Sequence, residues 1–288
     1  MKKCLVFGEA LYDVYPTHKK IGGAPLNFGA HFARLGGESH LLSAVGQDEL
    51  GEELLAEVKS LGVDTSLVKR KQDVPTGFCK VTYNGTEPVY NLPLGVSYDF
   101  ITYDREQRDC DLVYFGTLAV RSEVSRDTLR KLLTNTSAAE KFLDLNLRGS
   151  FYDEATVREL LTLATSLKLN RDEYEYCNEI FGINADSVSL FAASLAEKFD
   201  IGLVIVTLDK DGSAIYERCS KKFISAPIKE GKFVSAVGAG DSFSACFMYN
   251  YLSGAPLEVC IEKATSLASL VVGVEAAVPE YDGTRFIY

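Results

Sequence analysis

The chain has few of the residues and patterns that metal centres and disulfide-bonded folds require. It contains only three histidines in 288 residues, which argues against a histidine-based zinc site or a His-containing catalytic triad. Its seven cysteines are scattered, and no two of them form a CxxC pair. We interpret them as reduced thiols, and because no signal peptide is evident after Met1, we expect a cytoplasmic protein.

Charge and hydropathy exclude two further classes of partner. Forty acidic residues outnumber 30 basic ones, the net charge is −10, and lysine and arginine form no large cluster. Neither nucleic acid nor a membrane surface is therefore an expected partner. The longest apolar runs fall far short of the ~20 residues that span a bilayer. An apolar content of 47% is nevertheless enough for a large buried core.

Short β-branched runs alternate with amphipathic stretches along most of the chain. In residues 25–35, for example, Phe28, Phe32 and Leu35 form one apolar stripe, which predicts a helix that ends at the following glycine pair. We expect strands at 4–8, 39–45, 112–115, 141–145, 167–170 and 203–208, and helices at 25–35, 48–61, 125–133, 153–166, 173–181 and 187–199. This alternation predicts a single α/β domain over residues 1–288, with a doubly wound, mostly parallel sheet.

Two segments break the alternation. Residues 77–83 and 86–92 flank Asn84-Gly85, a favoured hairpin turn, and residues 11–21 also have an extended pattern. Together, segments of about 11–22 and 76–100 predict a small antiparallel sheet that stands off the main domain. We interpret it as a lid that keeps water from a phosphoryl donor; the alternative is a decoration at the edge of the sheet.

The most informative motif is Gly238-Ala239-Gly240-Asp241, which follows an extended stretch and opens a helical run that ends at Gly254. Glycines at a helix start expose unpaired N–H groups at the positive end of the helix dipole, a favourable place for phosphate. Asp241 would repel phosphate but could accept the proton of an attacking hydroxyl. The alternative is an ordinary turn with Asp241 as N-cap.

With two further motifs, the chain resembles the ribokinase-like (PfkB) family of carbohydrate kinases over essentially its whole length, and fructokinases most closely. Gly8-Glu9-Ala10-Leu11-Tyr12-Asp13 resembles the family's opening strand, which implies that Asp13 binds sugar. Gly22-Gly23-Ala24-Pro25-Leu26-Asn27 resembles its N-terminal signature, which implies a hinge at Gly22 and Gly23 and a sugar-binding Asn27. The motif at 238–241 matches the C-terminal signature, in which the aspartate is the catalytic base.

Three other segments carry roles that the resemblance implies. Asp144-Leu145-Asn146-Leu147-Arg148 resembles a fructokinase segment, so Asp144, Asn146 and Arg148 are expected near the sugar; the alternative is a surface salt bridge. Asn170-Arg171-Asp172-Glu173 resembles a motif in which Glu173 orders magnesium and Asn170 approaches the phosphates, although Asn and Glu at this spacing also form a capping pair. Thr207 and Gly212 lie in a turn that is expected to contact the nucleotide. Gly238 and Gly240 are also expected to contact the nucleotide.

The chain departs from the family at three places. Ser235-Ala236-Val237 replaces a run whose aspartate helps to hold a monovalent cation in several members, so potassium dependence stays open. Asp209 replaces a glycine near the expected nucleotide, and Thr265 lies where relatives often have an asparagine near the adenine.

The resemblance implies transfer of the γ-phosphoryl of Mg-ATP to a primary hydroxyl of a monosaccharide, with fructose favoured. Ribose, a keto-deoxy sugar acid or a nucleoside are the alternative acceptors; a sugar phosphate is less expected, because the hairpin offers only Lys80 as an anchor. A sugar-binding pseudokinase is the alternative from another class. A dinucleotide-dependent dehydrogenase and a Walker-type kinase do not fit, because the third glycine and a Gly-Lys-Ser/Thr sequence are missing. A homodimer through the lid is expected by analogy alone.

Overall fold

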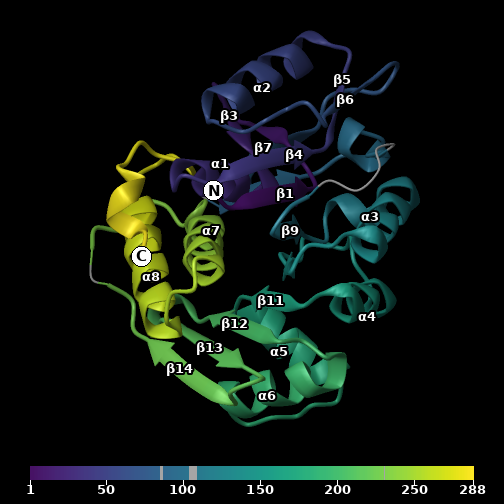
Figure 1. Cartoon of the computed structure of the whole chain (residues 1–288). Coiled ribbons are helices and arrows are strands. Elements are labelled where there is room, and N and C mark those ends of the chain that lie inside the picture. The colour runs from purple at the N-terminus through teal and green to yellow at the C-terminus, as the bar shows by residue number, and fades with distance from the viewer. Residues whose placement is uncertain (85–86, 104–108, 230) are drawn as a thin grey trace.

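The computed structural model describes residues 1–84, 87–103, 109–229 and 231–288. Its centre is an eight-stranded sheet with the strand order β14-β13-β12-β11-β10-β9-β1-β4 (Figure 1). All neighbours from β4 to β12 pair in parallel, and β13 and β14 are added antiparallel. The strands are β1 (Lys3–Phe7), β4 (Glu38–Leu42), β9 (Leu112–Phe115), β10 (Glu140–Asp144), β11 (Ser166–Leu169), β12 (Leu203–Thr207), β13 (Ser213–Glu217) and β14 (Lys222–Ala226).

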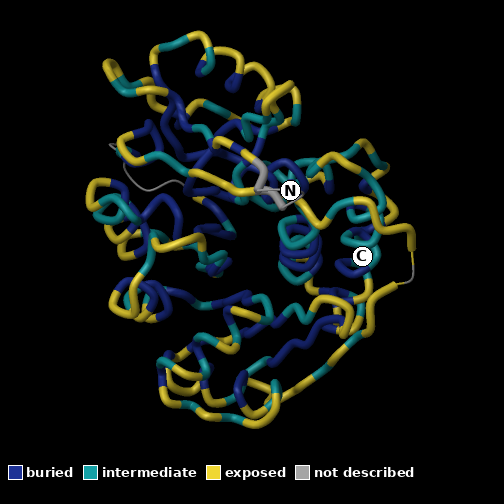
Figure 2. The backbone as a smooth tube through the Cα atoms, turned by 180° about the vertical axis from the view of Figure 1, so that it is seen from behind, coloured by how far each residue is buried: buried dark blue, intermediate teal, exposed yellow. Residues whose placement is uncertain are grey.

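Helices cover both faces of this sheet, as expected of a doubly wound fold. The long helices are α1 (Ala24–Arg34), α2 (Glu49–Ser60), α3 (Glu123–Asn135), α4 (Glu154–Leu163), α5 (Arg171–Ile180), α6 (Val188–Phe199), α7 (Ala239–Leu252) and α8 (Leu257–Val272). Buried residues of α1, α2, α7 and α8 form one apolar cluster, and those of α3 to α6 form another on the opposite face. Figure 2 shows the central strands buried and the outer turns of the helices exposed.

A second sheet has the strand order β3-β2-β7-β8. It contains β2 (Leu11–Val14), β3 (Lys19–Gly22), β7 (Phe78–Asn84) and β8 (Glu87–Asn91), so the predicted small sheet is present. Two of its pairings are antiparallel, but β2 pairs with β7 in parallel. The predicted turn at Asn84-Gly85 extends outside the described residues. Whether this sheet acts as a lid stays a prediction.

The expected segments differ from the structure in detail. The strand expected at 39–45 is two strands, β4 and β5 (Ala44–Gly46), and β5 pairs with β6 (Lys69–Lys71) in a separate parallel ribbon. Residues 232–237, the stretch expected to be extended before Gly238, form no strand. Single-turn helices lie at Ser97–Phe100 (η1), Ala119–Arg121 (η2), Asp209–Asp211 (η3) and Gly283–Phe286 (η4). In the described part of the chain, no helix combines the length and apolar character needed to cross a bilayer.

Candidate active site

The predicted anion site lies at the first turn of α7. Gly238 is the N-cap of this helix and has a left-handed backbone with φ of 80°. A Cβ atom at Gly238 would lie 2.5 Å from the carbonyl oxygen of Ala277, so only glycine fits there. The alternative interpretation, an ordinary turn with Asp241 as N-cap, is therefore wrong. Asp241 lies in the first helical turn, and no side chain caps the helix.

Asp241 and Asn27 meet in the folded chain although 214 positions separate them. Asn27 Nδ2 donates to Asp241 Oδ2 over 2.8 Å, from the first turn of α1 to the first turn of α7. Burial raises the pKa of Asp241 to about 6 and the Asp144 carboxylate adds to the rise, whereas Asn27 and Lys168 oppose it. A carboxylate with this pKa is ionised at neutral pH and can still accept a proton.

Lys168 is a site residue that the sequence analysis missed. Its ammonium group is buried, lies 3.0 Å from Asp144 Oδ1, and would lie 3.2 Å from a Cβ atom at Gly240. Burial opposes its charge, but the carboxylates of Asp144 and Glu173 outweigh that effect and raise the pKa of Lys168. An ammonium beside the positive end of α7 is unfavourable unless an anion binds between them. The sequence feature that could have identified this residue is a lysine inside the apolar run Leu167–Leu169, because a charge in a buried strand needs a partner.

Asp144 is the last residue of β10 and is almost completely buried. Its Oδ1 binds Lys168, and its Oδ2 accepts from Ser244 Oγ over 3.1 Å. The ion pair is thus internal, not the surface salt bridge considered as an alternative. Asp144 supports Lys168 directly, and direct contact with a sugar stays a prediction for this residue.

The remaining predicted sugar residues lie around the same edge of the sheet. Asp13 is half-buried in β2, and a Cβ atom at Gly22 would lie 2.8 Å from its Oδ2. Burial raises the pKa of Asp13, while Cys79, Arg148 and Lys20 oppose the rise. Gly23 has φ of 109°, and a side chain there would collide with the carbonyl of Glu9. Gly23 therefore requires glycine, whereas a side chain at Gly22 would displace only the carboxylate end of Asp13.

Asn146 and Arg148 lie in the loop after β10. Asn146 has a left-handed backbone with φ of 42°, and its carbonyl accepts from Thr117 Oγ1. Arg148 is exposed, and its charge lowers the pKa values of Asp13 and Asp241. Arg148 therefore lies within electrostatic range of both the predicted sugar carboxylate and the predicted base.

Asn170 and Glu173 form a reciprocal capping box at the start of α5. Glu173 N–H donates to Asn170 Oδ1, and Asn170 N–H donates to Glu173 Oε2. The other oxygen, Oε1, accepts from the backbone N–H of Leu147 over 2.8 Å. Glu173 is buried with both oxygens already bonded, so it fits a magnesium ion only at a distance, through water. Among the described residues, no three His, Cys, Asp or Glu side chains converge as a metal site.

The predicted nucleotide turn lies beside this helix. Thr207 ends β12, and its hydroxyl donates to the carbonyl of Leu169. Asp209 has φ of 51°, which explains why a glycine suits that position, and its carboxylate lies 3.3 Å from Arg171 Nε. Gly212 has φ of 92°, and a side chain there would collide with the backbone of Ala226. The carboxylate of Asp209 is therefore partly compensated by Arg171.

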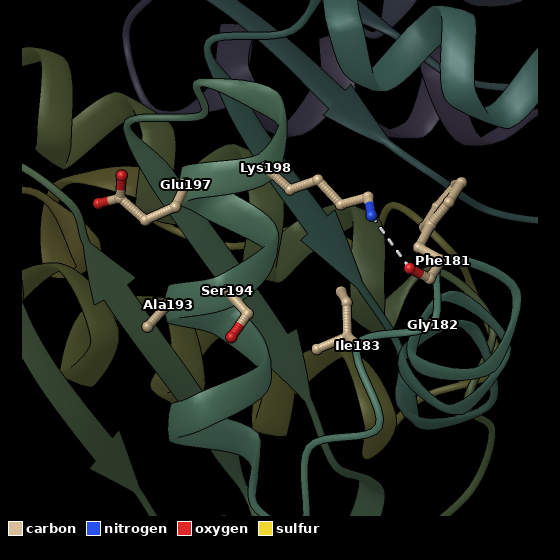
Figure 3. Close-up of a pocket in the computed structure, with 7 residues that line it drawn as sticks. All are labelled: Phe181, Gly182, Ile183, Ala193, Ser194, Glu197 and Lys198. Carbon is tan, nitrogen blue, oxygen red and sulfur yellow. Dashed lines mark hydrogen bonds between the residues drawn. The ribbon is translucent and has the colours of Figure 1, made fainter.

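The hollows in the described part of the structure include one beside α8 and one beside α6. One, of about 300 Å³, lies between the end of β14 and α8, and Ala226, Ile261 and Thr265 line it. The other, of about 600 Å³, lies between the end of α5 and α6, where Lys198 Nζ donates to the carbonyl of Phe181 (Figure 3). None of the predicted site residues lines the second hollow, so we do not assign the chemistry to it.

Comparison with known proteins places residues 1–281 in one family. The model of the pfkB family carbohydrate kinases matches residues 1–281. A Pyrococcus horikoshii protein named as an uncharacterized sugar kinase is 26% identical, with 92% of this chain and 83% of that protein covered. A fructokinase of Rhizobium leguminosarum is also 26% identical, with 84% and 77% covered.

Solved structures share the fold. Aminoimidazole riboside kinase of Salmonella enterica, solved with aminoimidazole riboside and an ATP analogue, superposes with a TM-score of 0.82 at 21% identity; 99% of each chain is covered. Fructokinase of Vibrio cholerae, solved with fructose, ADP and calcium, gives 0.80 at 20% identity, with 96% and 95% covered. The predicted fold class is thereby confirmed. Given the family match over residues 1–281, this chain belongs to the pfkB family of carbohydrate kinases.

Proposed function

We propose that this protein transfers the γ-phosphoryl group of Mg-ATP to a primary hydroxyl of a monosaccharide, with fructose as the favoured acceptor. The contact between Asn27 and Asp241 supports this proposal most directly, because it joins a sugar-orienting amide to a carboxylate at the anion site. The names of the relatives include kinases for fructose and for a riboside, so a fructose preference rests on the motifs of this chain.

In the proposed reaction, Asp241 accepts the proton of the acceptor hydroxyl as its oxygen attacks the γ-phosphorus. The bond between that phosphorus and the β–γ bridging oxygen breaks, and the electron pair leaves with ADP. The amides of Gly240 and Asp241 in the first turn of α7 would face the transferring oxygens, and the Ala239 amide could join them only on leaving the Ala236 carbonyl, to which it donates in this structure. The Lys168 ammonium, close to Gly240, would neutralise charge beside them. Magnesium, bound with the nucleotide, would supply further charge neutralisation, and Glu173 would reach it only through water.

Substrate placement follows from the same residues. Asp13 and Asn27 would accept and donate hydrogen bonds to the sugar hydroxyls, with Asn146 and Arg148 nearby and Gly22-Gly23 as a hinge. The nucleotide would lie along Asn170, Thr207 and Gly212, with its base in the 300 Å³ hollow beside Thr265. Two chains would pair through the β3-β2-β7-β8 sheet, and Val81 of β7, which is buried inside the chain, would not contribute to that interface.

A coupled assay of ADP release tests the proposal. We expect release with Mg-ATP and fructose and little with ribose, a keto-deoxy sugar acid or a nucleoside. Binding of fructose with no ADP release under any condition would contradict the kinase proposal and favour a sugar-binding pseudokinase. Faster turnover of another acceptor would contradict only the fructose assignment.

A further inference from the structure

Glu9 is a buried carboxylate that the proposed mechanism does not use. It follows β1 in the turn Gly8-Glu9-Ala10, at the edge of the main sheet where the site lies, and only 3% of it is exposed. Its Oε2 atom has no hydrogen-bond partner among the described residues. Leaving a buried carboxylate oxygen unbonded is costly, so a bound group or an ordered water must satisfy it.

Two buried tyrosines interact electrostatically with Glu9. Tyr98 and Tyr114 are fully buried, and neither hydroxyl has a hydrogen-bond partner within the described ranges. Both tyrosines lie within electrostatic range of Glu9. The Tyr98 ring packs against Gly77, where an added Cβ atom would lie 2.5 Å from the ring and 3.3 Å from the carbonyl of Ala10. Two buried tyrosine hydroxyls without described partners therefore lie within electrostatic range of Glu9, Tyr98 in one of the two apolar clusters and Tyr114 in the other.

This cluster adjoins the residues proposed to hold the acceptor. The carbonyl of Glu9 lies against Gly23, and the Glu9 carboxylate interacts electrostatically with Arg148 and Asp241. Tyr114 stacks on Phe28, the residue after Asn27, with ring centroids 4.2 Å apart. The cluster and the proposed sugar residues thus share one edge of the sheet.

The nearby arginines do not satisfy Glu9 in this structure. Arg121 donates to both carboxylate oxygens of Asp99, at 2.7 and 3.0 Å, and to the carbonyls of Leu92 and Pro93. Arg148 is exposed in its loop, and the orphaned Oε2 shows that it makes no hydrogen bond there. The missing partner is therefore an O–H donor, because an ionised carboxylate can only accept hydrogen bonds. An ordered water or a ligand hydroxyl would supply it, and the proximity of Gly23 and the proposed sugar residues favours the ligand.

We propose, on the basis of the kinase function above, that Glu9 is a specificity-determining residue. Its carboxylate accepts a hydrogen bond from a hydroxyl of an uncharged acceptor, with Tyr98 nearby, and it excludes acceptors that carry a negative charge at the position facing Glu9. A carboxylate or a second phosphate on the acceptor would be repelled strongly in this buried place, where charges are poorly screened. The acceptor class is then a neutral polyhydroxy compound, not a sugar acid or a sugar phosphate.

The ionisation of Glu9 gives this proposal a pH signature. Burial raises the pKa of Glu9 to about 7; Arg148 and Arg121 oppose the rise, and Asp241 adds to it. The ionised form, which accepts the sugar hydroxyl more strongly, therefore becomes dominant as the pH rises through about 7. Affinity for a neutral sugar should increase over that interval.

Equilibrium binding without nucleotide tests the proposal, because it reads sugar affinity apart from turnover. The probes are fructose, 2-keto-3-deoxygluconate and fructose 6-phosphate, measured by calorimetry on the whole chain. In Glu9→Gln we expect fructose to bind about 10-fold more weakly, since a charge-assisted hydrogen bond is lost. The preference for fructose over the acid should fall by a similar factor, and the pH dependence near 7 should disappear.

Two further variants make the result interpretable. Glu140→Gln is the control: Glu140 is half-buried and burial also raises its pKa, but it lies at the start of β10 and accepts from Thr165 and Ser166. It should leave all three affinities unchanged. Tyr98→Phe removes only a hydroxyl and should weaken fructose binding less than Glu9→Gln does, which keeps the test available if Glu9→Gln fails to fold.

The outcomes separate this inference from the kinase proposal. Unchanged affinities and pH dependence in both Glu9→Gln and Tyr98→Phe would overturn it, as would a wild type that prefers the acid or the phosphate. Loss of affinity by the same factor for all three probes would also overturn a role in charge selection. A wild type that binds fructose selectively but releases no ADP would contradict the kinase proposal alone.

Discussion

At the scale of single residues, the protonation of Asp241 gives the first prediction. Because burial raises its pKa to about 6, the base is ionised above that pH and becomes protonated as the pH falls through it. We expect kcat to be constant above pH 7 and to fall about 10-fold for each pH unit below 6. A kcat profile at saturating fructose and Mg-ATP measures this limb; activity that stays constant down to pH 4.5 would contradict the assignment.

Lys168 gives a second residue-scale prediction, which separates stability from function. Lys168→Met leaves the buried Asp144 carboxylate unpaired and should destabilise the fold by about 3–5 kcal/mol. The double variant Lys168→Met/Asp144→Leu should recover most of that stability, because apolar residues often replace a buried pair without loss. If Lys168 neutralises the transferring group, kcat should stay low in both variants. Full activity in the double variant, with the melting temperature restored, would show a purely structural role.

At the scale of elements, the turn that opens α7 can be tested against a matched glycine. Gly238 and Gly254 both have φ of 80°, but a Cβ atom would meet Ala277 at Gly238 and nothing within 4 Å at Gly254. Gly238→Ala should therefore cost stability beyond the ~1 kcal/mol backbone strain expected at both sites, and kcat should fall with it. Gly254→Ala should lower the free energy of unfolding only by the cost of that backbone strain, and its kcat should not change. Equal effects of the two substitutions in chemical denaturation and kinetics would contradict this account of the turn.

Periodicity predicted most of the elements that build the parallel sheet, since their buried strands are short apolar runs between amphipathic helices. It did not identify β13 and β14. β14 is a mostly exposed edge strand with a weak pattern, whereas β13 is buried but follows β12 after a single-turn helix, without the long amphipathic helix that separates the parallel strands. Lys168 was missed for a different reason. Its role depends on the pairing of β10 with β11, which places Asp144 opposite Lys168, and the sequence of either strand contains no sign of that register.

At the scale of the whole molecule, the site depends on contacts that no local pattern contains. Asn27 and Asp241 were each expected in the site from their motifs, but their hydrogen bond spans 214 positions. The capping box of Asn170 and Glu173 could be predicted from their spacing, and it is present. Its second bond to Leu147, in the loop after β10, follows only from the folded arrangement.

The small sheet gives a prediction at this scale. It carries Asp13 on β2 and is joined to α1 through Gly22 and Gly23, so closure on a sugar should order it. Hydrogen exchange should slow in β2, β3 and β7 when fructose binds, and exchange in β14, which carries none of the predicted sugar residues, should not change. Equal protection of both regions would indicate general stabilisation by the ligand, and no protection in β2 would contradict closure.

The most direct test of the central claim is the turnover of Asp241→Asn, measured together with its affinity for fructose. The substitution keeps the shape of the side chain but removes the proton acceptor beside the Gly238–Gly240 turn. We predict that kcat falls by roughly 10²–10⁴ while fructose affinity stays within a few-fold of wild type. A variant that binds fructose normally and turns over near the wild-type rate would contradict the claim that Asp241 is the base at a phosphoryl site.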